Sequence, residues 1–154
     1  MAIKIGISGF GRISRVAIRS AMDMPEIEIA GINYRSADEL GLEYMLYMLK
    51  YDSTFGRFPK ELEIYDGWLV INGKKVPIYS EKDATKIPWA DCGAEYIVEG
   101  TGAYNTTEKC QDHIDAGAKK VIITAPAKDD APTFVCGVNN TEYTSDMDVV
   151  SNAS

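Results

Sequence analysis

The sequence predicts an α/β fold built on a doubly wound, mostly parallel sheet, with an inserted antiparallel meander. Three observations predict this class. Segments that alternate as strands take turns with segments of helical spacing, a glycine-rich turn joins the first strand to the first helix, and two hairpin dipeptides lie close together mid-chain. The chain has 154 residues, the length of one ordinary domain, and we expect residues 1–154 to form a single unit.

The first half of the chain opens with a strand, helix, strand, helix series. Ile3–Ser8 alternates as a strand, and the turn Gly9-Phe10-Gly11 leads into a helix that runs to about Met22. Residues 28–32 form a second strand. A capping box of the form S-x-x-E begins at Ser36 and opens a second helix. Strand, helix and strand in this order predict a right-handed parallel βαβ unit.

The middle of the chain changes pattern. Residues 62–79 contain Asp66-Gly67 and Asn72-Gly73, two dipeptides that favour tight hairpin turns, each flanked by β-forming residues. We expect an antiparallel meander here, inserted between the parallel strands.

The second half returns to alternation. Strands are expected at residues 95–99, from Val121, at residues 134–138 and at residues 147–150. Asn105 and Glu108 mark the start of a helix at residues 107–116. These elements extend the parallel sheet.

Composition excludes several classes of protein. The chain carries 16 Lys and Arg against 23 Asp and Glu, a net charge of -7, which argues against binding nucleic acid or a polybasic membrane contact. The three cysteines, Cys92, Cys110 and Cys136, are widely spaced without a CxxC motif, so neither a disulfide framework nor a metal site is expected. They fit a reducing cytoplasm. Cys136 is interpreted as a buried structural thiol and the other two as ordinary thiols.

The single histidine, His113, stands beside Asp112 in a polar helical stretch. We interpret it as part of a solvated helix face. With one histidine, no histidine-based triad can be built from these residues.

The turn after the first strand resembles the Rossmann dinucleotide fingerprint G-x-G-x-x-G. Gly9 permits the tight turn, and Gly11 lets the backbone approach a pyrophosphate on the helix N-terminus. Ser14 occupies the third position, where the fingerprint has glycine. Serine is small enough for helix–strand packing, so the pattern favours nucleotide binding.

The end of the second strand leaves the choice of cofactor open. The fingerprint expects a carboxylate there for the adenosine ribose, but the chain has Asn33, Tyr34 and Arg35. Arg35 is either a solvated loop charge, which we favour, or a partner for a 2′-phosphate. Later strands also end in small residues, Thr101-Gly102 and Thr124, which leave room for a flat cofactor.

Five longer stretches carry a family resemblance: GFGRI, KYDSTFGRF, EGTGAY, KKVIITAPAKDDAPTFVCGVN and VVSNAS. They resemble the N-terminal, cofactor-binding half of phosphorylating glyceraldehyde-3-phosphate dehydrogenases over essentially the whole chain. The related erythrose-4-phosphate dehydrogenases are similar, and these residues do not separate the two.

The resemblance implies a site. Its cofactor-binding positions are the pyrophosphate turn with Arg12 and Ile13, the adenosine site, the adenine edge, and the ribose and nicotinamide side. In full they are Gly9, Phe10, Gly11, Arg12, Ile13, Asn33, Tyr34, Glu81, Lys82, Thr101, Gly102 and Thr124. Ser154 matches the family's serine that contacts phosphate, and the chain offers no metal ligands and no catalytic residue.

Three departures from the family pattern stand out: Ser14 for glycine, Gly100 for the serine of STG, and Tyr34 for aspartate. Loss of a carboxylate that accepts two ribose hydroxyls costs on the order of 1–3 kcal/mol. It also removes a charge that repels a 2′-phosphate. We therefore expect NAD as cofactor with a weaker preference than usual, and NADP is not excluded.

The family resemblance implies a cytoplasmic homotetramer that oxidises a phosphorylated aldehyde through a cysteine thioester, with NAD and inorganic phosphate, in glycolysis. The nucleophilic cysteine of the family follows SNAS, so we expect this chain alone to be non-catalytic, with a second, catalytic domain beyond it. The alternative is a stand-alone dinucleotide-binding module. We expect neither a nucleic acid nor a membrane as a binding partner.

Overall fold

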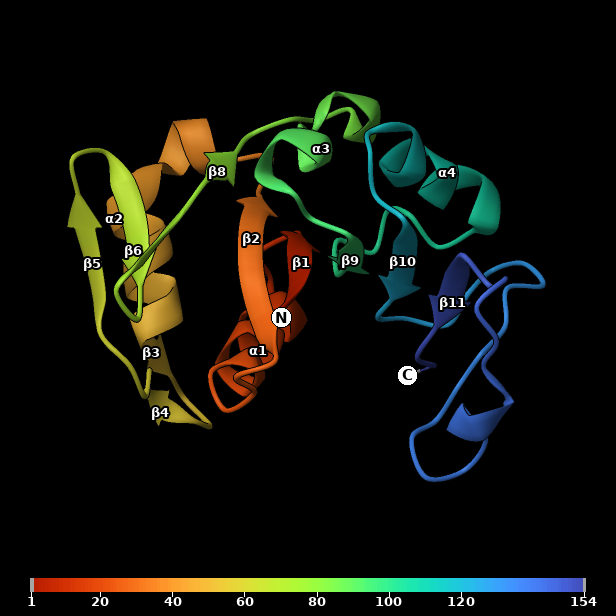
Figure 1. The fold of residues 1–154 in the computed structure, drawn as a ribbon. Coiled ribbons are helices and arrows are strands. Elements are labelled where there is room, and N and C mark those ends of the chain that lie inside the picture. Colours follow the sequence, from red (N-terminus) through yellow and green to blue (C-terminus); the bar gives the residue numbers. More distant parts are fainter. Residues whose placement is uncertain (1, 154) are drawn as a thin grey trace.

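The computed structural model describes residues 2–153 and centres on a six-stranded sheet (Figure 1). Its order is β11-β10-β9-β1-β2-β8, and neighbouring strands run parallel. The order reverses between β1 and β9, as in doubly wound sheets that bind dinucleotides. The predicted fold class is confirmed. The strands are β1 (Ile3–Ser8), β2 (Ile27–Asn33), β8 (Ile78–Tyr79), β9 (Tyr96–Glu99), β10 (Lys120–Ile123) and β11 (Val149–Ser151).

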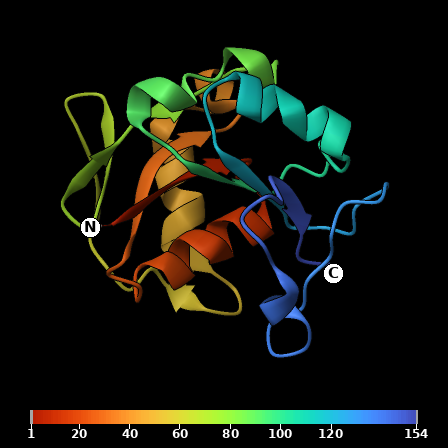
Figure 2. The same ribbon diagram turned by 45° about the vertical axis from the view of Figure 1, so that its right-hand side comes forward.

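Helices cover both faces of this sheet. In Figure 2, α1 lies below the strands and α4 above them. Alternation along β9 divides the core, because Tyr96 and Val98 pack against the cluster of α1 and α2 while Ile97 packs into the cluster of α3 and α4. The helices are α1 (Arg12–Ala21), α2 (Ala37–Lys50), α3 (Trp89–Cys92) and α4 (Thr107–Asp115), with short 3₁₀ turns η1 (Ala84–Lys86) and η2 (Asn140–Glu142).

The predicted meander is confirmed as the antiparallel sheet β5 (Leu62–Tyr65), β6 (Trp68–Ile71) and β7 (Lys74–Val76). Both of its turns have positive φ at their two central residues, including Asp66 at 53° and Asn72 at 51°. The meander ends earlier than expected, since residues 78 and 79 pair with β2 in the parallel sheet. A small hairpin of β3 (Tyr51–Asp52) and β4 (Gly56–Arg57) precedes it.

The capping box predicted at Ser36 is wrong. Ser36 precedes α2, but its side chain caps no amide, and its backbone (φ -100°, ψ 10°) is not extended as a capping residue requires. The amide of Asp38 instead donates to Ser80 Oγ at 3.2 Å. Gly41, at φ 83°, kinks the helix that the apolar spacing predicted as continuous.

The strand predicted at residues 134–138 does not form. Asn139 turns the chain there, since its side chain accepts from the amide of Val135 at 2.8 Å and donates to the carbonyl of Thr133 at 2.9 Å. In place of a strand, Thr133 forms an isolated bridge with Ser151 of β11. The periodicity of apolar residues could not reveal this side-chain competition with the backbone.

The helix α4 begins at Thr107 as predicted, but its capping residue is not the expected one. Thr106, and not Asn105, is the capping residue, and its side chain accepts from the amide of Lys109 at 3.1 Å. Asn105 donates instead to the carbonyl of Gly102 at 2.9 Å.

Candidate dinucleotide-binding site

A cavity of about 680 Å³ opens at the carboxyl ends of β1, β2 and β9, where the strand order reverses. Ligands of open parallel sheets bind at this point. Eight of the predicted cofactor positions line it. They are Gly9, Phe10, Gly11, Asn33, Tyr34, Glu81, Lys82 and Thr101.

The turn after β1 has the conformation that its glycine predicts. Gly9 has φ 104°, a backbone angle that residues with a side chain rarely adopt. A Cβ there would stand 3.1 Å from the backbone nitrogen of Thr101, so the turn after β1 lies directly against the turn after β9. The Gly9 amide donates to the carbonyl of Asn33 at 2.8 Å, which fixes this turn against the end of β2.

Gly11, unlike Gly9, has neither a backbone conformation nor a close contact that requires glycine. Its backbone (φ -73°, ψ -172°) suits any residue, and an added Cβ would meet nothing within 4 Å. It lines the cavity directly before α1, whose first turn carries no acidic residue and no side-chain cap. The first amides of a helix have no partner within it, so this end is left open to an anionic group. The cradle fits a pyrophosphate.

The side chains of Arg12 and Ile13 do not line the cavity. The Arg12 guanidinium donates to Asp52 at 2.9 and 3.3 Å and lies 5.9 Å from the ring centroid of Phe55. Ile13 is 57% exposed. Any contact of these two residues with the pyrophosphate would therefore come from their backbone amides.

Asp52 has a firmly ionised carboxylate. It accepts from the amides of Phe55 at 2.9 Å and Thr54 at 2.8 Å, and these bonds, with the pairing to Arg12, lower its pKa to about 2. The carboxylate thus holds the β3–β4 turn and the first residue of α1 together.

The end of the cavity next to β2 is built by two segments that are bonded to each other, the end of β2 and the segment after β8. The side chain of Asn33 donates to the carbonyl of Glu81 at 3.1 Å and accepts from its amide at 3.0 Å. The Tyr34 ring packs against Phe10, with centroids 5.7 Å apart. Asn33 is 5% exposed. Its polar atoms are used by the protein, so it shapes the pocket wall more than it offers a free hydrogen bond.

A buried polar chain supports the opposite wall. The Trp89 indole donates to His113 Nδ1 at 3.0 Å, and His113 Nε2 lies 2.6 Å from Glu99 Oε2. Because an indole nitrogen only donates, Nδ1 must accept, and the neutral ring donates from Nε2. Glu99 also accepts from the amide of Thr101 at 2.8 Å and from the Thr101 hydroxyl. This chain of hydrogen bonds therefore fixes Thr101, which lines the cavity.

The expectation that His113 lies on a solvated helix face is wrong, since it is fully buried. The available signal was its spacing of three residues from Cys110, which is also fully buried and lies on the same face of α4. Its partners, Glu99 and Trp89, are 14 and 24 residues away in the sequence. No local pattern could identify them.

The family model for the glyceraldehyde 3-phosphate dehydrogenase NAD binding domain matches residues 3–107. The chain belongs to this family.

Curated relatives extend the match along the chain. A glyceraldehyde-3-phosphate dehydrogenase from Lentinula edodes is 51% identical over 154 residues, covering 100% of this chain and 44% of the relative. A cytosolic one from Gracilaria gracilis is 50% identical over 151 residues, covering 98% of this chain and 44% of the relative. The chain thus spans a little less than half the length of the relatives that it matches, and it corresponds to their N-terminal, NAD-binding part.

Two further predicted positions of this NAD-binding domain, Gly102 and Thr124, do not line the cavity. Thr124 donates both its amide and its hydroxyl to the carbonyl of Glu99, at 3.1 and 3.0 Å. Gly102 accepts from Asn105 and has φ 79°. The predicted phosphate position, Ser154, lies outside the described residues.

The expectation for the cysteines is partly wrong. Cys136, predicted to be buried in a strand, is exposed because the strand does not form. Cys110 is fully buried, and burial raises its pKa to about 12, with the nearby Glu99 charge contributing. Cys92 is half-buried.

Over residues 2–153, no helix has both the length and the apolar character needed to cross a bilayer. The same residues contain no group of three or more His, Cys, Asp or Glu side chains that could hold a metal ion.

Proposed function

We propose that the cavity holds NAD in an extended form across the reversal of strand order, with its adenosine by β2 and its pyrophosphate on α1. The observation that carries the proposal is the open space at Gly11, where an added Cβ would meet no atom at the N-terminus of α1. Membership of the NAD-binding family supports the same cofactor. When bound, NAD supplies the hydride acceptor.

The residues of this chain bind and orient the cofactor. The first amides of α1 hold the pyrophosphate, Tyr34 and the paired segments of Asn33 and Glu81 enclose the adenosine, and Lys82 lies at its edge. Thr101, fixed by Glu99, faces the same cavity. We assign Gly102 and Thr124 to the ribose and nicotinamide side, as the family resemblance implies.

For the complete protein, we propose phosphorylating glyceraldehyde-3-phosphate dehydrogenase activity in glycolysis. Residues 1–154 then form the cofactor domain, and a second domain supplies the cysteine nucleophile, with Ser154 beside the substrate phosphate. The names of the relatives support this reaction over the erythrose 4-phosphate alternative. The same family membership supports a homotetramer, and the cytosolic relative supports a cytoplasmic location.

The variant Gly11→Ala tests NAD binding without disturbing the fold. Its backbone angles suit alanine and the methyl group meets nothing, so thermal unfolding should stay within about 2 °C of the parent. The methyl group would stand where the pyrophosphate approaches, so calorimetry should show NAD binding at least about tenfold weaker. Unchanged NAD affinity with unchanged stability would contradict the proposal.

Activity is tested in the complete protein by following NAD reduction with glyceraldehyde 3-phosphate in the presence and absence of inorganic phosphate. Reduction that depends on phosphate supports the proposed reaction. Faster turnover of erythrose 4-phosphate, or no reduction with either aldehyde, would contradict it.

A further inference from the structure

Two cations stand at the end of the cavity where NAD-binding sheets place an acid. Arg35 and Lys82 line the cavity next to Tyr34, and both are exposed. Among the described residues, neither takes part in an ion pair. Their charges are therefore available to a ligand.

The fold holds these two residues close together although they are distant in sequence. The segment after β2 and the segment after β8 are joined by the pair of hydrogen bonds between Asn33 and Glu81. Ser80 Oγ adds a second link, donating to the carbonyl of Arg35 at 3.0 Å and accepting from the amide of Asp38 at 3.2 Å. The positions of both cations are thus set by backbone contacts that leave the side chains free.

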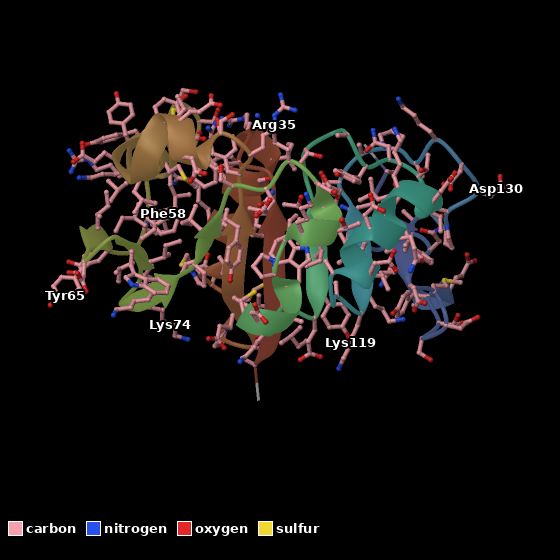
Figure 3. All side chains as sticks on the ribbon, turned by 90° about the horizontal axis from the view of Figure 1, so that it is seen from above. Arg35, Phe58, Tyr65, Lys74, Lys119 and Asp130 are labelled. Atoms are coloured by element: carbon pink, nitrogen blue, oxygen red, sulfur yellow. The ribbon has the colours of Figure 1, made fainter. Side chains whose placement is uncertain are left out.

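Figure 3 shows the Arg35 side chain projecting from the ribbon at the edge of the molecule opposite Lys119. Lys119 directly precedes β10, so it marks the amino ends of the parallel strands, and Arg35 marks the carboxyl ends. The guanidinium therefore extends on the ligand side of the sheet.

The remaining groups at this end favour an anion. The side chain of Asn33 is committed to Glu81, and the ring of Tyr34 packs on Phe10, so neither replaces a carboxylate as acceptor for two ribose hydroxyls. The charged residues of the cavity wall are Glu81 and Asp112 against Arg35, Lys82 and Lys109. Asp112 and Lys109 belong to α4, so the adenosine end carries one acid against two cations.

We propose that this site accepts the 2′-phosphorylated dinucleotide NADP as well as NAD, an inference that rests on the proposed dinucleotide function. Arg35 donates to the 2′-phosphate, and Lys82 supplies a second positive charge beside it. A guanidinium near the second strand is the group that accommodates this phosphate in doubly wound sheets. The absence of a carboxylate at Tyr34 removes the repulsion that normally excludes it.

Calorimetry on the full chain tests this with two probes, ADP-ribose and 2′-phospho-ADP-ribose, which differ only in the phosphate. We expect the parent chain to bind both, with dissociation constants within about tenfold of each other. Arg35→Gln should shift their ratio by about tenfold in favour of ADP-ribose. Tyr34→Asp should shift the ratio in the same direction by adding a repelling charge.

Lys60→Gln is the matched control, since it removes one exposed positive charge from a residue outside this cavity. It should leave the ratio unchanged. A parent chain that binds ADP-ribose but binds the phosphorylated probe more than about a hundredfold more weakly would overturn the inference. So would an unchanged ratio in Arg35→Gln. Failure to bind either probe would instead overturn the proposed dinucleotide function itself.

Discussion

Ser14 and Gly100 share one tight contact between α1 and the turn after β9. A Cβ added to Gly100 would overlap Ser14 Oγ, and Ser14 is fully buried. The two residues are separate departures from the pattern that the chain resembles, one a serine for glycine and the other a glycine for serine. In the structure they form a single exchange, in which the side chain added on one side is balanced by the one absent on the other.

This exchange predicts strong coupling between the two positions. Gly100→Ser alone should lower the free energy of unfolding by about 1–3 kcal/mol, because it overpacks the contact. Ser14→Gly alone should cost about 0.5 kcal/mol through helix propensity. The double variant should lose less unfolding free energy than the two single variants together, by at least about 1 kcal/mol, as measured by urea unfolding.

Gly102→Ser serves as the control for this cycle. Unlike Gly100, Gly102 has no atom within 4 Å of an added Cβ, so the cost of Gly102→Ser comes from its positive φ and not from Ser14. Its effect should add to that of Ser14→Gly. Additive losses for the Gly100 pair would refute the shared contact.

The buried chain around Glu99 predicts a second effect on stability. Glu99 accepts hydrogen bonds from His113 and Thr101. In Glu99→Gln the carboxylate becomes an amide, whose NH₂ group must face one of these donors. We expect a loss of about 1–3 kcal/mol of unfolding free energy. Glu95→Gln, whose partner Lys119 is exposed, should change stability by less than about 0.5 kcal/mol. Equal effects of the two variants would contradict the buried network.

The cysteines predict a clear order of reactivity. At about pH 8, near the ordinary thiol pKa, a thiol reagent should modify exposed Cys136 first. Cys110 should remain unmodified until the chain unfolds, because it is fully buried and its pKa is raised to about 12. Mass spectrometry of the labelled peptides locates the modified thiol, and Cys136→Ala should remove the fast phase. Rapid labelling of Cys110 in the folded chain would be incompatible with this packing.

Asp52 predicts a pH dependence at the acid end. Its folded pKa, about 2, lies below the ordinary value of 3.8, chiefly because of the Phe55 and Thr54 amides. A lowered acid pKa stabilises the fold above the unfolded value, and this contribution disappears as the pH falls from about 3.8 through 2. NMR titration of the Asp52 carboxyl carbon should show a midpoint near 2. A midpoint near 3.8 would show that the turn does not hold the carboxylate.

The sequence predicted the parts of the fold that depend on local pattern. Gly9 has the positive φ that its turn required, and the dipeptides at Asp66 and Asn72 form the hairpins. These outcomes follow because turn chemistry acts over two to four residues.

Features set by distant partners could not be predicted. Ser36 does not cap α2, and the amide of Asp38 donates instead to Ser80, which lies in the segment after β8. His113 is buried because Trp89 and Glu99 reach it from separate elements. At the candidate site, the glycine turn followed from its motif, whereas the commitment of the Asn33 side chain to Glu81 is visible only in the structure.

The most direct test of the central claim is a titration of the chain with NAD, followed by two-dimensional amide NMR spectra. The account predicts saturable shifts at Gly9, Gly11 and Thr101, together with the amides at the start of α1. The hairpin glycines Gly67 and Gly73, which do not line this cavity, should not shift. Absence of saturable shifts, or shifts confined to residues outside the carboxyl ends of β1, β2 and β9, would contradict it.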